Sequence, residues 1–283
     1  MKEMYNSIQE PVIGVLDSGV GGLTVAREIM HQLPKESIYY IGDNQRCPYG
    51  PRKREEVKKF TYELVEFLMQ FPLKAIVIAC NTASAAALDS LQKELSIPVI
   101  GVIHPGARAA IKVTNHQKVG VIGTIGTIQS NMYAQALQEL HPYIKVYSLA
   151  CPTLATVVEH HLDDEIYVKQ QVEQALKPFH NKDIDTLILG CTHYPHLETY
   201  IREVIGENVS IISSAEETAV ELSAILQHQG SLSQLISPPF HRYFTTGPIN
   251  TFEHIAEKWL GHAISAEYVN LKENYDILRS IGI

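Results

Sequence analysis

Residues 74–82 read KAIVIACNT, and residues 185–193 read DTLILGCTH. Each segment is a short apolar run that ends in a cysteine followed by polar residues. Apolar runs of this length are typical of strands buried in a parallel sheet. The cysteines, Cys80 and Cys191, lie 111 positions apart, and so do the starts of the two runs. The two segments are therefore interpreted as the same part of two copies of one fold.

Six further apolar runs extend this repeat in both directions. The first series is Val12–Leu16, Ser37–Ile41, Lys74–Ala79 and Pro98–Ile103, and the second is Val119–Ile122, Ile144–Leu149, Asp185–Gly190 and Val209–Ser213. Corresponding strands start 107 residues apart for the first two pairs and 111 for the last two, so one four-residue insertion explains the change. Amphipathic helices separate the strands. We predict an α/β fold of two pseudo-symmetric lobes, each a mainly parallel sheet flanked by helices, with the functional site in the cleft between them.

The tail of the chain is too short for a third core and is expected to pack back on the first lobe. It contains a predicted helix at Glu217–Gln227, a predicted strand at Arg242–Thr246, and a helix with Phe252 and Trp259 on one face. The predicted first lobe therefore comprises residues 1–103 plus 216–283. The predicted second lobe comprises residues 104–215.

Composition and charge exclude several classes of protein. The chain has 283 residues and a formal net charge of -8, without the clustered basic face of a nucleic-acid-binding protein. Its start is polar, and no run approaches the roughly 18 apolar residues that span a bilayer. The four cysteines have no CxxC spacing, which is typical of free thiols in a reducing compartment. We expect a cytoplasmic protein with no membrane and no nucleic-acid partner.

The carboxyl ends of the strands are where ligands bind in parallel sheets. The first strand is followed by Asp17-Ser18-Gly19-Val20-Gly21-Gly22, and its counterpart by Gly123-Thr124-Ile125-Gly126-Thr127. Cys80 and Cys191 end the third strands, where backbone N–H groups and a helix dipole are expected to lower the thiol pKa. We predict two reactive thiols that face each other across the cleft.

Other interpretations of these residues are weaker. The glycine-rich turn has Thr24 where G-x-G-x-x-G needs glycine, and no phosphate-binding lysine follows, so a nucleotide is poorly supported. A metal site at Cys191, His193 and His196 would need partners from elsewhere, and none is predicted. Cys47 and Cys151 are interpreted as structural. His160 and His161 are interpreted as part of a solvated helix face.

A set of motifs occurs along nearly the whole chain in a characteristic order. They are Asp17-Ser18-Gly19-Val20-Gly21-Gly22, Asp43 with Pro48-Tyr49-Gly50, Ala79-Cys80-Asn81-Thr82, Gly123-Thr124, Gly190-Cys191-Thr192-His193-Tyr194-Pro195, and Thr246-Gly247 ahead of Trp259-Leu260-Gly261. This ordered set resembles the aspartate/glutamate racemase superfamily, and within it the glutamate racemases. One departure is Pro248-Ile249 after Thr246-Gly247, where an acidic residue is common.

The resemblance implies cofactor-independent interconversion of L-glutamate and D-glutamate, which would supply D-glutamate for bacterial peptidoglycan synthesis. Racemisation needs a base on one face of Cα and an acid on the other, a demand that two thiols meet. The resemblance makes Cys80 and Cys191 these groups, with Asp17 and His193 in support, and it implies no cofactor and no metal. The implied substrate-binding residues are Asp17, Ser18, Tyr49, Gly50, Asn81, Thr82, Thr124, Glu159, Thr192 and His193.

Alternatives remain open at this point. Glutamate is favoured over aspartate only by the segments around Pro48-Tyr49-Gly50 and Cys191-Thr192-His193, so another amino-acid racemase or a related lyase is a second interpretation. A non-catalytic two-lobe module that binds a dicarboxylate is a third, although such a module has no need of paired thiols. The sequence maps no subunit interface, and a homodimer stays open.

Overall fold

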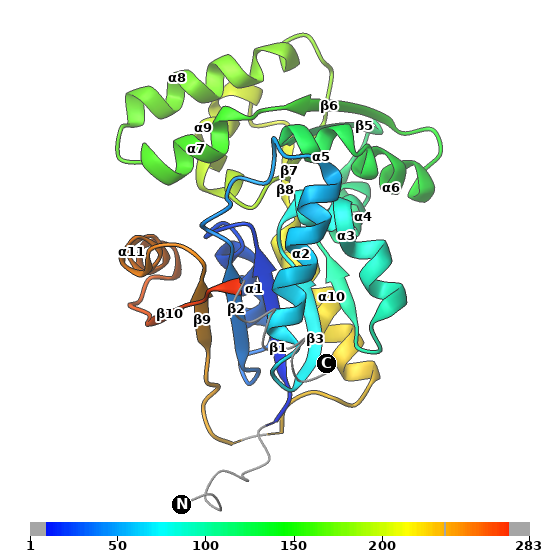
Figure 1. Ribbon diagram of the computed structural model, residues 1–283. Coiled ribbons are helices and arrows are strands. Elements are labelled where there is room, and N and C mark those ends of the chain that lie inside the picture. Colours follow the sequence, from blue (N-terminus) through cyan, green and yellow to red (C-terminus); the bar gives the residue numbers. More distant parts are fainter. Residues whose placement is uncertain (1–9, 235, 272–283) are drawn as a thin grey trace, which may run out of the picture.

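Two parallel sheets lie one above the other in the computed structural model, which describes residues 10–234 and 236–271 (Figure 1). The six-stranded sheet has the order β10-β9-β2-β1-β3-β4, and the four-stranded sheet has the order β6-β5-β7-β8. The strands of the first sheet are β1 (Val12–Asp17), β2 (Ile38–Gly42), β3 (Leu73–Ile78), β4 (Val99–Gly101), β9 (Arg242–Thr245) and β10 (Ala266–Tyr268). Those of the second are β5 (Lys118–Gly123), β6 (Lys145–Ala150), β7 (Thr186–Gly190) and β8 (Ser210–Ser213).

The order of the strands repeats between the two sheets. The order β2-β1-β3-β4 in the first corresponds to β6-β5-β7-β8 in the second. The registers also correspond, because β1 pairs Leu16 with Ile78 of β3, and β5 pairs Ile122 with Leu189 of β7. The predicted α/β fold of two repeated lobes is confirmed.

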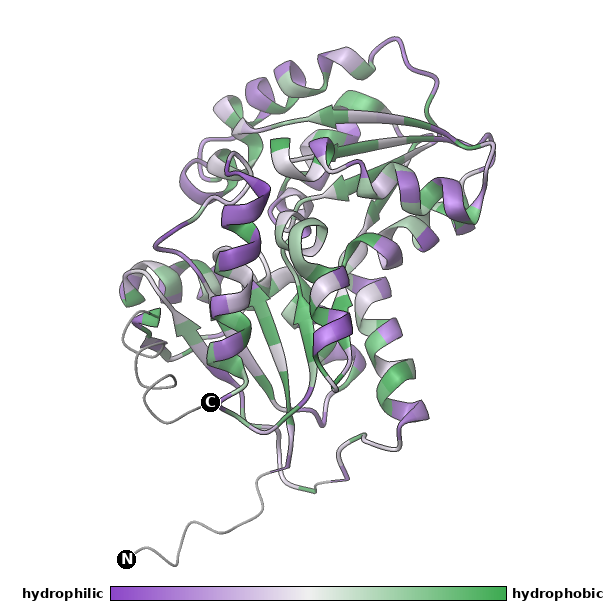
Figure 2. Cartoon of the chain, turned by 45° about the vertical axis from the view of Figure 1, so that its right-hand side comes forward, coloured by the Kyte–Doolittle hydropathy of each residue, from purple (hydrophilic) through white to green (hydrophobic). Residues whose placement is uncertain are grey.

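The helices connect and flank the strands. They are α1 (Leu23–Gln32), α2 (Arg54–Leu68), α3 (Asn81–Glu94), α4 (Ile103–Val113), α5 (Ile125–Gln129), α6 (Met132–Leu140), α7 (Thr153–His160), α8 (Glu165–Leu176), α9 (Glu198–Ile205), α10 (Ser214–His228) and α11 (Ile249–Leu260). Two 3-10 turns, η1 (Lys177–Phe179) and η2 (Tyr194–Leu197), complete the elements. Figure 2 shows apolar residues concentrated in the strands and polar residues along the helices.

Helix α2 illustrates why these segments are helical. Val57, Leu64 and Leu68 recur at helical spacing and are buried. Glu55 and Glu56 lie in the first turn, where the positive end of the helix dipole stabilises carboxylates. The sequence pattern therefore defines both the buried face and the start of this helix.

The structure differs from the sequence-based expectation at the end of β4 and in the tail. The strand predicted at Pro98–Ile103 ends at Gly101, because Ile103 already begins α4 and Pro105 is accommodated in the first turn of that helix. The tail adds two strands to the first sheet, since β9 pairs with β2 and β10 pairs with β9. Strand β10 was not predicted, because it has three residues, of which only Ala266 is buried.

The largest apolar core extends through both lobes. It contains Val77 of β3, Leu187 of β7 and Leu222 of α10, and α10 packs against both α1 and α4. The division of the chain into lobes at residues 103 and 215 stays a prediction. Residues 1–9, 235 and 272–283, which it assigns to the first lobe, lie outside the described part of the chain. Within residues 10–234 and 236–271, the helices are too short or too polar to cross a membrane.

Candidate active site

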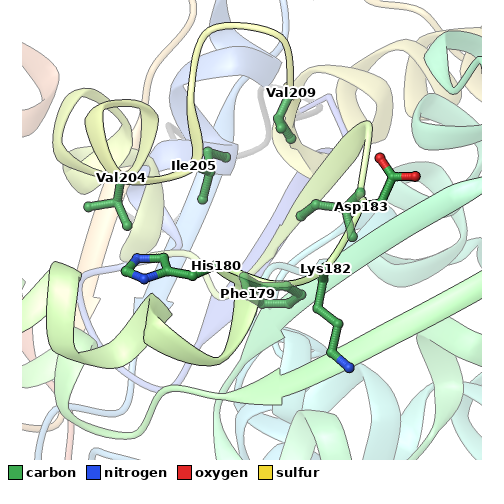
Figure 3. A pocket seen from close by; sticks show the side chains of 8 residues that line it. Phe179, His180, Lys182, Asp183, Val204, Ile205 and Val209 are labelled. Atoms are coloured by element: carbon green, nitrogen blue, oxygen red, sulfur yellow. The ribbon is translucent and has the colours of Figure 1, made fainter.

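A cavity of about 170 Å³ lies at the carboxyl ends of the strands and is lined by both lobes. Its lining residues are Ser18, Cys47, Pro48, Tyr49, Gly50, Cys80, Asn81, Thr82, Thr124, Ala155, Thr156, Glu159, His160, Cys191, Thr192 and His193. Of the predicted site residues, all but Asp17 belong to this lining. A second hollow, of about 230 Å³, lies away from it between η1, α9 and β8 and contains none of them; Figure 3 shows Val204, Ile205 and Phe179 around it.

Cys80 lies where β3 leads into α3. It is the N-cap residue of α3, so its sulfur accepts a hydrogen bond from Ala83 N at 3.5 Å, and its S–H donates to Ser18 Oγ at 3.6 Å. Burial, together with the nearby charge of Asp17, raises the pKa of Cys80 to about 12. The predicted lowering of this pKa is wrong, because desolvation of the thiolate outweighs the hydrogen bond from the helix terminus.

Asp17 is fully buried beneath the wall of the cavity. Its Oδ1 accepts a hydrogen bond from Gly19 N at 2.9 Å, and its Oδ2 accepts one from Thr192 Oγ1 of the other lobe at 3.4 Å. Burial raises the pKa of Asp17. This carboxyl group therefore contacts residues from both halves of the site without facing the cavity itself.

Cys191, His193 and Glu159 form a chain of contacts in the second lobe. Cys191 Sγ lies 3.7 Å from His193 Nδ1, and His193 Nε2 lies 2.8 Å from Glu159 Oε1. Burial alone would lower the pKa of His193, but its hydrogen bonds to Cys191 and Glu159 raise that pKa well above its usual value. Burial likewise opposes ionisation of Glu159, yet the contact with His193 lowers its pKa. The pair is therefore an imidazolium and a carboxylate.

Glycines allow the two lobes to approach each other at the site. A Cβ on Gly21 would lie 2.6 Å from two atoms of the His193 ring, and a Cβ on Gly50 would lie 2.6 Å from Thr124 Cβ. The carbonyl of Gly50 also accepts a hydrogen bond from Gly126 N at 2.8 Å. The glycines of the motifs after β1 and β2 thus leave room for residues of the second lobe.

Hydroxyl and amide groups from both lobes meet at the cavity. Thr82 Oγ1 lies 2.8 Å from Thr124 Oγ1, and Thr124 caps α5 by accepting from Thr127 N at 3.2 Å. Asn81 Oδ1 accepts a hydrogen bond from Tyr133 OH at 2.7 Å. These neutral groups can donate hydrogen bonds to a carboxylate.

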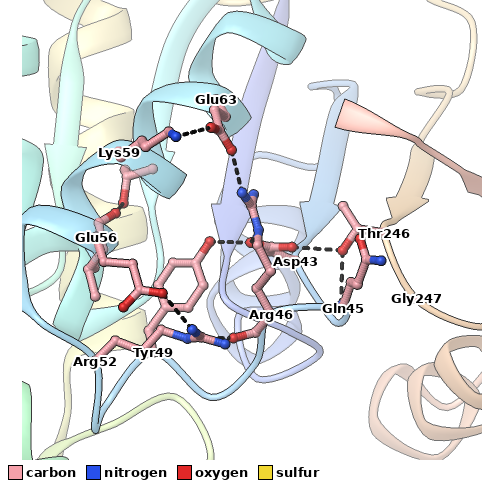
Figure 4. Close-up of polar contacts among 12 residues, drawn as sticks. Asp43, Gln45, Arg46, Tyr49, Arg52, Glu56, Lys59, Glu63, Thr246 and Gly247 are labelled. Atoms are coloured by element: carbon pink, nitrogen blue, oxygen red, sulfur yellow. Dashed lines mark hydrogen bonds and ion pairs between the residues drawn. The ribbon is translucent and has the colours of Figure 1, made fainter. Parts of the chain in front are cut away.

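Tyr49 is held in the wall of the cavity by a buried carboxyl group (Figure 4). Its hydroxyl donates to Asp43 Oδ2, while Asp43 also accepts from Arg46 Nε at 2.6 Å and from Thr246 Oγ1 at 2.7 Å. The tail of the chain thereby contacts the loop that carries Tyr49. Asp43 acts on the cavity through Tyr49 and does not line it.

The interpretation of Cys47 as purely structural is wrong in one respect, because this residue also lines the cavity. Its S–H donates to Glu159 Oε1 at 3.7 Å, and burial raises its pKa. The adjacent Pro48-Tyr49-Gly50 motif was the available signal. His160 also lines the cavity, although 62% of its side chain is exposed, in line with the predicted solvated face. Cys151 lies in the apolar core, as expected.

The histidines considered as metal ligands have other contacts. His196 stacks on Trp259 with ring centroids 4.0 Å apart, and His193 meets the same indole edge-on at 5.9 Å. In the part of the chain that the structure describes, no three His, Cys, Asp or Glu side chains are grouped so as to hold a metal ion. These contacts instead attach α11 to the second lobe.

Comparison with known proteins extends over nearly the whole chain. The family model described as Asp/Glu/Hydantoin racemase matches residues 13–222. A glutamate racemase of Bacillus cereus is 51% identical over 93% of this chain and 96% of its own. The crystal structure of a glutamate racemase isoform from Bacillus anthracis has a TM-score of 0.91 and 70% identity, covering 92% of this chain and 98% of that one. The structure of the Francisella tularensis glutamate racemase in complex with D-glutamate has a TM-score of 0.87 and 36% identity, covering 93% and 99%. The resemblance inferred from the motifs is confirmed, and the chain belongs to the Asp/Glu/Hydantoin racemase family.

Proposed function

We propose that this protein interconverts L-glutamate and D-glutamate by moving a proton at Cα between two cysteines. The observation that carries the proposal is that Cys80 and Cys191, at equivalent positions of the two repeats, line one cavity. The charge of Cys191 also contributes to the raised pKa of Cys80, which fits two sulfurs within electrostatic range of each other. The names of the relatives, and the D-glutamate held by the Francisella tularensis enzyme, support glutamate as the substrate.

The two thiols are proposed to take opposite roles in each direction of the reaction. Cys80 is a neutral thiol at neutral pH and can donate a proton, since its pKa is about 12. The imidazolium of His193 stabilises negative charge on the Cys191 sulfur, 3.7 Å away. Cys191 then removes the Cα proton from one face, and Cys80 delivers its own proton to the other face. The resulting Cys80 thiolate and Cys191 thiol are the starting form for the reverse reaction.

Neutral donors are proposed to hold the two carboxylates of the substrate. Ser18, Asn81, Thr82, Thr124 and Thr192 present hydroxyl or amide groups at the cavity, and Tyr49 with Gly50 lines another part of its wall. Such groups can bind carboxylates without an arginine. Removal of the Cα proton places negative charge on the α-carboxylate, and donors fixed in advance stabilise that charge at little reorganisation cost. Asp17 supports this arrangement by holding Thr192.

We expect the protein to act in the cytoplasm. All four cysteines are free thiols in the structure, and two of them are the proposed catalytic groups. Thiols persist in a reducing compartment. The D-glutamate formed there would supply peptidoglycan synthesis.

Chiral analysis of the purified protein tests the proposal. After removal of pyridoxal phosphate and metals, incubation with either enantiomer in deuterated water is expected to give racemic glutamate labelled at Cα. Cys80→Ala and Cys191→Ala are each expected to abolish racemisation, whereas Cys151→Ala, a change at a core thiol outside the cavity lining, is expected to keep it. Full activity in either active-site variant contradicts the two-thiol reaction. Tight glutamate binding without exchange would instead favour the non-catalytic binding module.

A further inference from the structure

We propose that Tyr133 is a positioning residue: its hydroxyl fixes the side-chain amide of Asn81 so that the NH2 group donates to a substrate carboxylate. The proposal rests on the proposed function, because it concerns binding of the same substrate. Tyr133 does not line the cavity and would act only through Asn81.

The contact between the two residues is short, buried and made across the lobes. Tyr133 lies on α6, which follows the second sheet's β5, and Asn81 is the first residue of α3, which follows β3 of the first sheet. Tyr133 OH donates to Asn81 Oδ1 at 2.7 Å, and each residue is 3% exposed. A hydrogen bond shielded from water in this way fixes the orientation of a side chain more firmly than an exposed one.

The ring of Tyr133 has little freedom to move. A Cβ on Gly190, at the end of β7, would lie 3.1 Å from Tyr133 Cε2. A Cβ on Gly106 of α4 would lie 3.3 Å from the Tyr133 hydroxyl and 3.0 Å from Ser214 Cβ. Backbone at two glycines therefore approaches the ring closely, and the position of the hydroxyl is determined by packing.

The chemistry of the two groups gives this contact a direction. Burial raises the pKa of the Tyr133 phenol, so the hydroxyl keeps its proton and remains a donor. The oxygen of the Asn81 amide accepts that proton, which leaves the NH2 group of the same amide for another acceptor. Asn81 lines the cavity, where the acceptor is a carboxylate of the substrate. A rotated amide would present its oxygen to the carboxylate and repel it.

The substitution Tyr133→Phe removes the hydroxyl and keeps the ring. We expect KM for both enantiomers of glutamate to rise about fivefold, the effect of losing one hydrogen bond. Tyr143→Phe makes the same change at a tyrosine that is 85% exposed and is expected to leave KM unchanged.

Coupling to Asn81 distinguishes positioning from simple packing. In an Asn81→Ala background the same Tyr133→Phe change is expected to have no further effect on KM, because the group that it positions is gone. Asn81→Asp keeps an oxygen for Tyr133 but has no NH2 to donate, so its KM is expected to rise at least as much as that of Asn81→Ala. This variant tests the donor independently of Tyr133.

Three results would overturn the inference: an equal effect of Tyr133→Phe in both backgrounds, a wild-type KM in Tyr133→Phe despite a lowered melting temperature, or a wild-type KM in Asn81→Asp. Failure of the proposed function gives a different result, since the wild-type protein itself would then not racemise glutamate. The activity of the wild-type protein is therefore measured first, in the same assay.

Discussion

His193 contacts a thiol on one side and a carboxylate on the other, so its charge acts on both groups. Burial opposes both shifts, but hydrogen bonds raise the pKa of His193 and lower the pKa of Glu159. The raised pKa of His193 stabilises the fold fully below its unfolded value of 6.5, and this contribution is lost as pH rises through the folded pKa. The lowered pKa of Glu159 stabilises the fold above 4.5, and this contribution is lost as pH falls. The pair therefore stabilises the fold most between these two values.

The substitution Glu159→Gln tests this pair. Loss of the carboxylate is expected to lower the pKa of His193, so that the alkaline limb of the kcat/KM profile moves to lower pH by about 1 unit or more. Glu173→Gln changes an exposed residue of α8 and is expected to leave the profile in place. An alkaline limb at the same pH in both variants would show that Glu159 does not control the protonation of His193.

His196 lies beside this pair, and burial, with the charge of His193 as a second cause, lowers its pKa to about 4. The unfolded chain therefore binds more protons than the folded protein between pH 6.5 and 4, and stability falls as pH falls through that range. His196→Phe keeps a ring against Trp259 and removes the titrating nitrogen. Between pH 7.5 and pH 5, we expect the free energy of unfolding of this variant to fall by about 1 to 2 kcal/mol less than that of the wild type. Urea unfolding followed by circular dichroism measures this difference. His254→Phe makes the same change at an exposed site. An equal fall in the free energy of unfolding of the two variants over this pH range would contradict the assignment to His196.

The sequence predicted which residues line the cavity better than it predicted their ionisation. Cys80, Cys191 and His193 could be located because the carboxyl ends of parallel strands meet at one edge of each sheet. The raised pKa of Cys80 could not be predicted. A helix terminus is visible in the sequence, whereas burial depends on the packing of both lobes. Cys47 was missed for the same reason, because its loop reaches Glu159 only in the folded chain.

The motif after β1 joins two elements from different lobes. At Gly21 the turn before α1 lies against Thr192 and His193, where a Cβ would be within 2.6 Å of the His193 ring. Gly21→Ala is expected to displace His193 and to lower kcat/KM by about 100-fold, since small displacements of catalytic groups have effects of this size. Gly14→Ala, in β1 itself, would meet the flexible ends of Leu68 at 3.2 Å and Leu73 at 3.4 Å and is expected to change activity little. Activity near the wild-type value in Gly21→Ala would show that this close approach is not required.

A buried ion pair joins β3 to the loop before β2, and both partners contact the segment that follows α10. Lys74 Nζ lies 2.9 Å from Glu36 Oε2 and donates to Ser231 O at 2.7 Å, while Glu36 Oε1 accepts from Ser233 N at 2.7 Å. Lys74→Met leaves a buried carboxylate unpaired and is expected to cost about 3 to 5 kcal/mol in urea unfolding. The double variant with Glu36→Gln is expected to recover most of this loss.

A surface ion pair provides the control for that experiment. Lys112→Met breaks the pair with Glu217, in which the lysine side chain is 62% exposed, and is expected to cost less than about 1 kcal/mol. Equal costs for Lys74→Met and Lys112→Met would show that burial of the Lys74 pair does not contribute to stability.

The strands of the repeat were predicted from sequence, whereas a short strand outside the repeat was not. The predicted strands of the repeat have three to five apolar residues each, and their regular spacing along the chain supports the assignment. Strand β10 has three residues at the edge of the sheet, and the start of α4 at Ile103 continues an apolar run without a break. In both places tertiary pairing, which a local pattern does not contain, determines the structure.

At the scale of the whole molecule, the site and the core are both shared between the lobes. The largest core contains residues of β3, β7 and α10, and the cavity is lined from both sheets. A shared core favours unfolding as one cooperative unit. Glutamate bound between the lobes should stabilise that unit as a whole, since a ligand that binds only the folded state stabilises it by mass action.

Thermal unfolding with and without glutamate tests this coupling. At 100 times its dissociation constant, glutamate is expected to add about 2.7 kcal/mol to the free energy of unfolding. For a chain of this length that corresponds to a rise in melting temperature of roughly 5 to 10 °C in a single calorimetric transition. L-Lysine at the same concentration has the same α-amino acid group with a cationic side chain, and it is expected to shift the transition little. Two transitions, of which glutamate moves only one, would place the binding site within a single lobe and contradict the cavity that both lobes line.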